Sequence, residues 1–369
     1  MNRLSIGARV IDNDSPVYIV AEIGTAHRGN IDIAKKLIDA AKGAGADCVK
    51  FQAVIAEEII HPRTGDVLLP GGSTPLFEVF LSVERGADFY AAIKHHAEAM
   101  DLEFLCTPFG LGSARILKEI GVSCVKIASP ETNHYPLLSA IRGWGIPLII
   151  STGVSRLGDI ERAIDFIGHR SIAVLHCVTS YPAPEIDYNV RCIETLSRAF
   201  GTIVGVSDHS LDPRLVPVLS VLSGAKIIEK HITLDKAGDG LDDPVALTPT
   251  EFSEMVASIR QADIDTQKEV LGALHTEFGR EKVTAVKGTG LKILADSEKD
   301  SYLTTNRSVL AISDIKAGEI ISSENVALLR SEKNLIPGLP PESLSVISGK
   351  HAVRDIQNGS GLSWDDVMM

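Results

Sequence analysis

The stretch GAKIIEKHITLD, residues 224–235, changes character in its middle. Residues 227–228 are isoleucines of the kind that fill a buried β-strand, yet Glu229, Lys230 and His231 follow at once. Burying a charge costs free energy unless the charge is paired or bound. The end of this strand therefore has to lie where the three side chains meet water, one another or a ligand.

The same change from apolar strand to polar end recurs along the chain. The runs that show it are VYIVAEIG (17–24), DCVKFQ (47–52), EFLCTPF (103–109), CVKIAS (124–129), PLIIST (147–152), IAVLHC (172–177), IVGVSDH (203–209) and KIIEKHIT (226–233). Segments with helical spacing of apolar residues, such as IDIAKKLIDAAKGAGA (31–46), separate them. Apolar strands that alternate with helices indicate a parallel sheet covered on both faces. Eight such units in about 250 residues predict a (β/α)8 TIM barrel.

A doubly wound α/β sheet is the alternative fold for this alternation. Its dinucleotide fingerprint G-x-G-x-x-G is replaced after the first strand by GTAHRG (24–29), which favours the barrel. We expect a catalytic barrel over residues 1–290, a polar linker over 291–305 and a small β-rich C-terminal domain over 306–369. Because a domain of about 60 residues is marginally stable by itself, we expect it to dock on another surface.

The composition excludes several kinds of partner. The chain has 369 residues, of which 44% are hydrophobic and 23% charged, and its formal net charge is −12. An acidic chain without a basic tract is a poor ligand for nucleic acid or for an anionic membrane. The first residues, MNRLSIGARV, lack the apolar core of a signal peptide, and the five cysteines show no metal-type spacing. We expect a cytoplasmic protein that binds small molecules.

A barrel brings the carboxyl ends of all its strands to one rim, where the active sites of this fold lie. Alternation along the strand places Glu229 and His231 on one side and Lys230 on the other. His209 ends the neighbouring strand, so the two imidazoles can approach each other. They suit a divalent first-row metal ion. Two hydrogen-bonded histidines in a polar core, or one histidine acting as a base, are the alternatives.

A second group of strand ends carries positive charge and hydroxyls. Lys50 and Lys126 end the second and fourth strands. The hydroxyls that end other strands belong to Thr107, Ser129, Ser151 and Ser207. This composition suits a phosphate or carboxylate dianion, and structural ion pairs with Glu22 or Glu131 are the alternative. The long loop at 53–86 is expected to cover the mouth of the barrel.

Together these motifs resemble the sialic acid synthase (N-acetylneuraminate synthase) family, including other nonulosonic acid synthases and the spore-coat polysaccharide variant. The motifs that carry the resemblance are AEIGTAHRG (21–29), ADCVKFQ (46–52), CTPF (106–109), VKIASPE (125–131), STG (151–153), SYPAP (180–184), GVSDHS (205–210), IEKHITLD (228–235) and GLDDP (240–244). They span nearly the whole chain. The resemblance implies a TIM barrel followed by a small domain similar to type III antifreeze protein, an antifreeze-like (SAF) domain.

The resemblance also implies a reaction, the condensation of phosphoenolpyruvate with an N-acylated hexosamine such as N-acetylmannosamine or a related acetamido sugar. The products are a sialic acid-like 2-keto sugar acid and phosphate. A divalent metal is implied on His209 and His231, namely Mn²⁺, with Mg²⁺ or Co²⁺ as alternatives. The implied catalytic residues are Glu22, Lys50, Lys126 and Glu131. The implied substrate-binding residues are Gln52, Thr107, Ser129, Ser151, Thr179, Tyr181, Ser207, Glu229, Asp242 and Arg330.

In this family the small domain serves the site of a partner chain, which implies a domain-swapped homodimer with Arg330 at the partner's barrel mouth. The match is incomplete, because Ser331 stands where the family has Pro-Gly after the arginine. Ala26 and the segment 240–242 (Gly-Leu-Asp) also depart from the family pattern. The phosphoenolpyruvate half of the site thus follows the family pattern more closely than the sugar half does. The sequence does not identify the acceptor sugar.

Two other functions fit the same residues. A metal-dependent pyruvate aldolase or lyase would use the same rim without needing the lysine and hydroxyl set. A catalytically silent sugar-binding protein of polysaccharide assembly would agree with Ala26 and with the altered region after Arg330.

Overall fold

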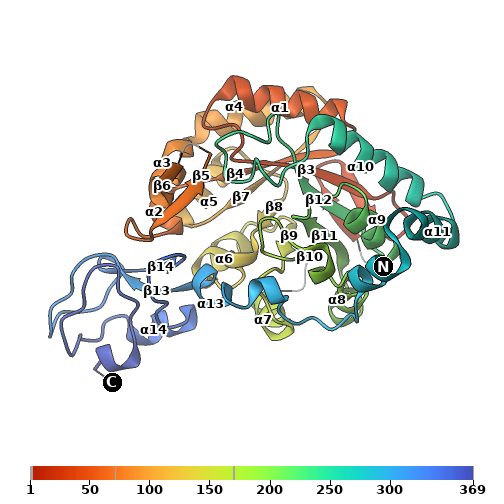
Figure 1. Ribbon diagram of the computed structural model, residues 1–369. Helices are drawn as coiled ribbons and strands as arrows, with labels where there is room; N and C mark the ends of the chain where they lie inside the picture. Colours follow the sequence, from red (N-terminus) through yellow and green to blue (C-terminus); the bar gives the residue numbers. More distant parts are fainter. Residues whose placement is uncertain (1–2, 71, 169–170, 369) are drawn as a thin grey trace.

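The computed structural model describes residues 3–70, 72–168 and 171–368. Within these residues, eight parallel strands close into a barrel in which each strand lies beside the next one in the sequence (Figure 1). They are β3 (Tyr18–Gly24), β4 (Cys48–Ala53), β7 (Glu103–Pro108), β8 (Val125–Ile127), β9 (Leu148–Ser151), β10 (Ile172–Cys177), β11 (Ile203–Asp208) and β12 (Ile227–His231). The last strand pairs with the first, with His231 opposite Glu22. The predicted TIM barrel is confirmed.

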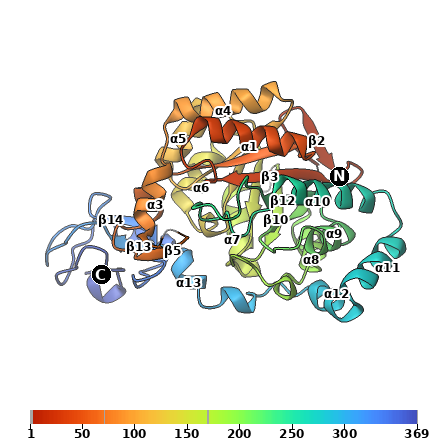
Figure 2. The ribbon, with the colours of Figure 1, turned by 45° about the horizontal axis from the view of Figure 1, so that its top comes forward.

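Helices cover the outside of the barrel between consecutive strands (Figure 2). They are α1 (Ile31–Gly43), α4 (Ala87–Ala99), α5 (Leu111–Glu119), α6 (Tyr135–Arg142), α7 (Leu157–Ile167), α8 (Cys192–Phe200), α9 (Leu215–Leu222) and α10 (Pro249–Ala262), with short 3₁₀ turns η1 (Ser129–Glu131) and η2 (Glu185–Asp187). Side-chain caps fix where helices begin. Asn30 accepts backbone hydrogen bonds at the start of α1, and Thr248 forms a capping box with Glu251 at the start of α10. None of the helices in the described part of the chain combines the length and apolar character that a membrane crossing requires.

A hairpin closes the amino-terminal end of the barrel. Strands β1 (Arg3–Ile6) and β2 (Arg9–Asp12) pair in antiparallel fashion. Their side chains Leu4, Ile6 and Ile11 pack against inward-facing apolar side chains of the barrel strands. Those side chains include Val20, Cys48, Leu105, Ile149, Leu175, Ile203 and Ile227. Because this end is filled with apolar side chains, the polar strand ends at the opposite rim are left to form a site.

The segment between β4 and α4 folds over that rim. It contains α2 (Ala56–Ile59), β5 (Asp66–Leu69), β6 (Gly72–Pro75) and α3 (Leu76–Val83). Its apolar side chains form one cluster with side chains from the rim, and the members include Ile59, Val67, Leu76, Phe80, Phe109 and Leu241. We call this segment, residues 53–86, the lid. The lid covers the barrel mouth, as its length predicts.

The chain continues beyond the barrel through α11 (Gln267–Phe278) and α12 (Arg280–Lys287). The connecting segment, residues 291–305, carries η3 (Asp296–Glu298) and α13 (Tyr302–Thr305). The C-terminal domain then contains β13 (Arg307–Ala311), β14 (Val326–Arg330), η4 (Pro341–Ser343), α14 (Leu344–Ile347) and η5 (Trp364–Asp366). It has an apolar core of its own, which includes Val309, Ile315, Ile321, Leu328 and Ile347. Figures 1 and 2 both show this domain beside the lid, away from the helices α8 to α12.

Arg307, at the start of β13, joins the C-terminal domain to the barrel. Its Nε donates to Glu131 Oε2 at 2.8 Å, and both groups are buried. The remaining guanidinium nitrogens donate to backbone carbonyls of the lid, of β14 and of the segment after β7, which are those of Glu58, Ile59, Leu328 and Phe109. One side chain therefore holds the domain, the lid and the rim together.

Replacing Arg307 by Met should destabilise the protein. The substitution leaves Glu131 with Arg330 alone and leaves four carbonyls without their donor, and removing one partner of a buried ion pair costs about 3–5 kcal/mol. Urea unfolding measures the loss. Arg354→Met is the matched control, because Arg354 is largely exposed where it pairs with Asp366, and such pairs contribute under about 1 kcal/mol. Equal stabilities of the two variants would contradict the role of Arg307.

Candidate active site

A cavity of about 520 Å³ lies at the carboxyl ends of the barrel strands. Its wall contains every predicted site residue except Glu131, namely Glu22, Lys50, Gln52, Thr107, Lys126, Ser129, Ser151, Thr179, Tyr181, Ser207, His209, Glu229, His231, Asp242 and Arg330. These residues are far apart in the sequence. The barrel brings most of them together because their strands end at one rim, while Asp242 comes from the loop after β12 and Arg330 from the C-terminal domain.

Lys50 lies in the cavity wall between two carboxylates. Its Nζ is 2.7 Å from Glu22 Oε2 and 3.8 Å from Glu229 Oε1. The same Nζ donates to Thr107 Oγ1 at 3.4 Å. Burial disfavours the charged form of Lys50, but the two carboxylates outweigh burial and raise its pKa. Lys50 is thus a firmly charged group, and its pairing with Glu22 is the ion pair that we considered as the alternative.

Lys126 is also buried, and it lies farther from a carboxylate than Lys50 lies from Glu22. Its Nζ donates to Ser151 Oγ at 2.5 Å and to the carbonyl oxygen of Ile127 at 3.1 Å. The carboxylate nearest to it among the described residues, Glu229, is 3.8 Å away. Burial is the largest influence on the pKa of Lys126 and lowers it. A bound anion would compensate this charge and the loss of hydration.

The two histidines face each other across adjacent strands, as the alternation predicts. The ring centroids of His209 and His231 are 5.5 Å apart. The ring of Tyr181 stacks on His209 at 4.2 Å. Nδ1 of His209 lies 2.8 Å from the carbonyl oxygen of Val178. A carbonyl only accepts, so Nδ1 carries a proton, and Nε2 offers a lone pair when the ring is neutral. Nδ1 of His231 lies 3.7 Å from Asp242 Oδ2.

This donor set fits a divalent metal in part. Burial lowers the pKa of His231, which favours the neutral imidazole that a metal requires. Burial acts the same way on His209, but the Cys177 thiol and the Val178 carbonyl outweigh it and raise the pKa to about 9. The described residues contain no cluster of three or more His, Cys, Asp or Glu arranged for a metal ion. The chain thus offers two histidines, and further ligands would have to come from substrate or water.

Lys230 points away from the cavity and supports the two histidine strands from outside. Its Nζ donates to Asp208 Oδ2 at 2.6 Å, and both side chains are fully buried. Nζ also donates to the carbonyl and the hydroxyl of Ser210. Asp208 ends β11 directly before His209, and Lys230 precedes His231 on β12. The ion pair therefore fixes the ends of both strands, and with them the two rings.

Glu131 does not lie where we expected a catalytic residue. It is absent from the described cavity wall, and its two carboxylate oxygens accept from Arg307 at 2.8 Å and from Arg330 at 2.6 Å. Burial disfavours its ionised form, but the two arginines outweigh burial and lower its pKa. In this structure Glu131 joins the C-terminal domain to the barrel, and its assignment as a catalytic residue stays a prediction.

Arg330 reaches the cavity from the C-terminal domain of the same chain. Its guanidinium lies 5.3 Å from the centre of the Phe109 ring, and its backbone forms a bridge with Ile60 of the lid. Arg330 and Lys333 both contribute to the cavity wall. The contact that we predicted between partner chains is thus made here within one chain, and the domain-swapped homodimer stays a prediction.

Sequence reasoning missed several parts of the wall. The lid contributes apolar side chains, Val67, Leu76 and Phe80, and the connecting segment contributes hydroxyls, Ser297, Ser301, Thr304 and Thr305. Cys177 also lines the cavity, with Sγ 3.9 Å from His209 Nδ1. The lid could be anticipated from its length. The connecting segment could not, because its polar composition gave no signal beyond that of a linker.

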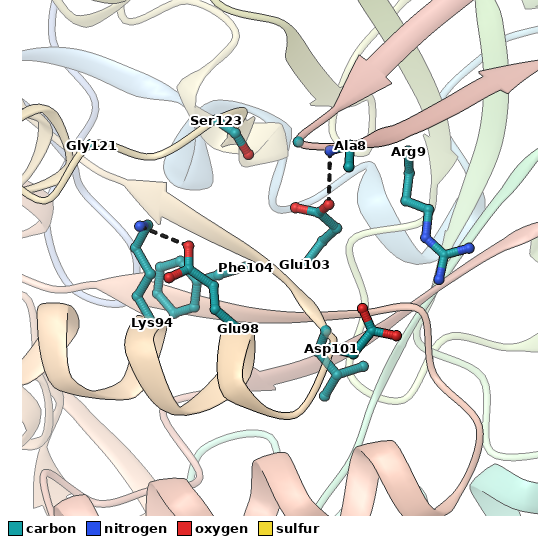
Figure 3. A pocket seen from close by; sticks show the side chains of 11 residues that line it. Ala8, Arg9, Lys94, Glu98, Asp101, Glu103, Phe104, Gly121 and Ser123 are labelled. Carbon is teal, nitrogen blue, oxygen red and sulfur yellow. Dashed lines mark hydrogen bonds and ion pairs between the residues drawn. The ribbon is translucent and has the colours of Figure 1, made fainter.

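A second hollow, of about 260 Å³, lies near the opposite end of the barrel beside the β1–β2 hairpin. Figure 3 shows that charges of both signs surround it. Glu103 accepts from the backbone of Ala8 at 3.0 Å, and Lys94 pairs with Glu98 at 2.8 Å. Two of its ionisable groups, Lys94 and Glu98, pair with each other, and the functional assignment rests on the carboxyl-end cavity.

The cavity, the histidine pair and the docked small domain are those of a (β/α)8-barrel enzyme. The family model described as "NeuB family" matches residues 37–270, and the model described as "SAF domain" matches residues 306–368. The chain belongs to the NeuB family, and its resemblance to the sialic acid synthases is confirmed.

Relatives of known name cover the chain almost completely. The spore coat polysaccharide biosynthesis protein SpsE of Bacillus subtilis is 35% identical over 100% of this chain and 98% of its own length. The N,N'-diacetyllegionaminic acid synthase of Legionella pneumophila is 31% identical over 99% of each chain. The crystal structure of the B. subtilis protein superposes with a TM-score of 0.83 at 34% identity, covering 100% of this chain and 99% of that one.

Replacing Lys230 by Met should destabilise the barrel by about 3–5 kcal/mol, because Asp208 is left charged and buried without its partner. Urea unfolding followed by circular dichroism measures the change. The double variant Asp208→Asn, Lys230→Met is the control, since it removes both charges and should recover part of the loss. A single variant as stable as the parent chain would show that the pair does not hold the strand ends.

Proposed function

We propose that this protein is a phosphoenolpyruvate-dependent nonulosonic acid synthase. It condenses phosphoenolpyruvate with an N-acylated hexosamine and releases phosphate and a sialic acid-like 2-keto sugar acid. Family membership supports a synthase, and relatives named as legionaminic and pseudaminic acid synthases support this kind of product. The observation that carries the choice of phosphoenolpyruvate is Lys126, a buried lysine that donates to the Ser151 hydroxyl and lies 3.8 Å from the Glu229 carboxylate, which Lys50 shares at the same distance.

The lysines and hydroxyls form the half of the cavity that would take phosphoenolpyruvate. Lys126 with Ser151, and Lys50 with Thr107, present two ammonium groups, each beside a hydroxyl. Both lysines would offset the charge of the phosphate and carboxylate groups of the substrate. They would also stabilise the charge that develops on the leaving phosphate.

The reaction needs a base as well as an anion site. In the balanced reaction, C3 of phosphoenolpyruvate bonds to the aldehyde carbon of the open-chain sugar while the enol double bond and the aldehyde π bond break, and the aldehyde oxygen takes up a proton to become a hydroxyl. Water adds at C2, the bond from C2 to the phosphate oxygen breaks, and C2 becomes the keto carbon as phosphate leaves. A carboxylate near C2 would accept the proton of that water. We assign this role to Glu22, which lies in the cavity wall. Lys50 and Gln52 hold its carboxylate, at 2.7 Å and 2.8 Å.

A divalent metal would be held by His209 and His231, with Mn²⁺ as our first choice and Mg²⁺ or Co²⁺ as alternatives. When bound, it would supply Lewis-acid polarisation of the aldehyde oxygen. The residues around it belong to this chain. Asp242 lies beside His231 at 3.7 Å, and the Val178 carbonyl orients His209 through Nδ1 at 2.8 Å. A hydrogen bond to the second ring nitrogen, as His209 makes with Val178, fixes the tautomer of a metal-binding histidine.

One assay tests the proposal. The protein is incubated with Mn²⁺, phosphoenolpyruvate and each of a panel of 2-acetamido sugars, and phosphate release is followed together with the mass of the product. Phosphate released in equal amount to a 2-keto acid, with one or more of the sugars, supports the synthase. Cleavage of such an acid to pyruvate without use of phosphate would instead identify an aldolase.

Replacing Lys126 by Met should weaken the binding of phosphoenolpyruvate by at least about tenfold, because a hydrogen bond to a charged group contributes roughly 1.5–3 kcal/mol. Titration calorimetry of phosphoenolpyruvate without sugar measures this directly. Lys36→Met on the exposed side of α1 is the matched control and should bind as the parent chain does. Unchanged affinity in Lys126→Met would refute this placement of the anion.

Replacing either His209 or His231 by Ala should abolish metal-dependent turnover while the fold persists, because each removes one of the two imidazole donors. Binding of Mn²⁺, measured by electron paramagnetic resonance, should weaken in both variants. His95→Ala, on the exposed face of α4, is the matched control. Full activity of the parent chain in excess chelator would exclude a metal from the reaction.

A further inference from the structure

Glu298 lies in η3 of the connecting segment, and its surroundings are unusual for a linker residue. Its exposed fraction is 1%. Oε1 accepts from the backbone N–H groups of Val154 at 2.6 Å and of Thr179 at 2.7 Å. Oε2 accepts from the backbone N–H of Ala295 at 3.2 Å. One buried carboxylate thus binds two loops that follow different barrel strands, and it also caps its own 3₁₀ turn.

We propose that Glu298 is a positioning residue that holds the phosphoenolpyruvate half of the cavity in its working shape. This inference rests on the function proposed above. Glu298 itself does not line the cavity. It acts through the loop after β9 and the loop after β10, which it joins to the segment leading into the C-terminal domain.

The first loop is held in a conformation that it would not adopt freely. Val154 has φ of +39°, a left-handed conformation that is rare for a β-branched residue and costs free energy. Two side chains, one from the connecting segment and one from the residue directly after it, hold the backbone of Val154 on both sides. Glu298 accepts from its N–H, and Nδ2 of Asn306 donates to its carbonyl oxygen at 2.9 Å. Without these two partners the backbone at Val154 would be free to relax.

Relaxation at Val154 would reach the cavity through Gly153. The N–H of Gly153 donates to Ser129 Oγ at 2.9 Å, and Ser129 lines the cavity. A Cβ on Gly153 would lie 2.0 Å from Thr179 Oγ1 and 3.1 Å from Ser129 Oγ. The two loops and the η1 turn are therefore in close contact at this glycine. A shift of one moves the hydroxyls of Ser129 and Thr179.

The carboxylate itself is required for this arrangement. Its hydrogen-bond partners are backbone N–H groups, and no lysine or arginine of the described residues lies within ion-pair distance of it. Hydrogen bonds of this kind stabilise a buried anion. Glutamine keeps one acceptor oxygen, which can serve Val154 and Thr179, but its amide N–H group would face the N–H of Ala295. Alanine removes all three bonds.

The test compares Glu298→Ala, Glu298→Gln and a control, Asp296→Asn. Asp296 lies in the same turn, is exposed, and its carboxylate pairs with Lys299. Hydrogen–deuterium exchange of peptides that contain Val154 and Thr179 reports on the loops without any substrate. Titration calorimetry of phosphoenolpyruvate, and KM for phosphoenolpyruvate and for the sugar, report on the cavity.

We expect Glu298→Ala to speed exchange in both loops. We also expect it to raise KM for phosphoenolpyruvate by about tenfold or more, the effect of losing hydrogen bonds to a charged group, with KM for the sugar changed far less. Glu298→Gln should lie between Glu298→Ala and the parent chain, and Asp296→Asn should match the parent chain. If the parent chain does not bind phosphoenolpyruvate, the proposed function is contradicted. The hydrogen–deuterium exchange data would still test the role of Glu298 in the two loops.

The proposal is overturned if Glu298→Ala exchanges in both loops as the parent chain does. It is also overturned if the glutamine variant, which keeps an acceptor at this position, loses affinity for both substrates to the same degree. The second pattern would mark Glu298 as a general stabilising residue.

Discussion

The contact between Arg307 and Glu131 is the constraint on which the arrangement of the C-terminal domain and the lid over the cavity depends. The arginine donates to the barrel through Glu131, to the lid through the carbonyls of residues 58–59 and to the rim through Phe109. A buried guanidinium is tolerable only because every one of these acceptors is in place. Arg307 therefore holds the C-terminal domain and the lid together. We call these two parts the roof of the cavity, and Arg330 of the C-terminal domain belongs to the cavity wall.

Beneath that roof, the floor of the site follows from the alternation of side chains along the strands. On β12, Glu229 and His231 face the cavity, and Lys230 faces outward to Asp208. One strand thus supplies two functional groups and, between them, the cation that holds its end to β11. The polar ending of the stretch at 224–235 has a physical explanation: two of its ionisable groups face a ligand cavity, and the third is neutralised by a buried partner.

The strand ends and their inward-facing residues could be predicted because period-two alternation and the barrel closure are encoded locally in each strand. The roof could not, because its contacts join segments far apart in the sequence. Arg307 and Glu298 show no local pattern, and their partners Glu131 and Val154 lie more than a hundred residues away. Glu131 illustrates the same limit. The resemblance identified this carboxylate, but nothing in the sequence indicated the two arginines that bind it.

The difference between strand-end residues and contacts of distant segments also explains why the proposed anion-binding half of the site can be assigned in more detail than the proposed acceptor half. The anion half consists of lysines and hydroxyls on strand ends, whose positions the barrel fixes. The acceptor half is bordered by the lid and by the loop after β12, where Leu241 packs with Val67 and Phe80 in one apolar cluster. The polar groups beside that cluster, Asp242 and Arg330, come from a loop and from the C-terminal domain. Substitutions in such segments leave the barrel intact, so under the proposed function the acceptor sugar can change while the proposed phosphoenolpyruvate site stays constant.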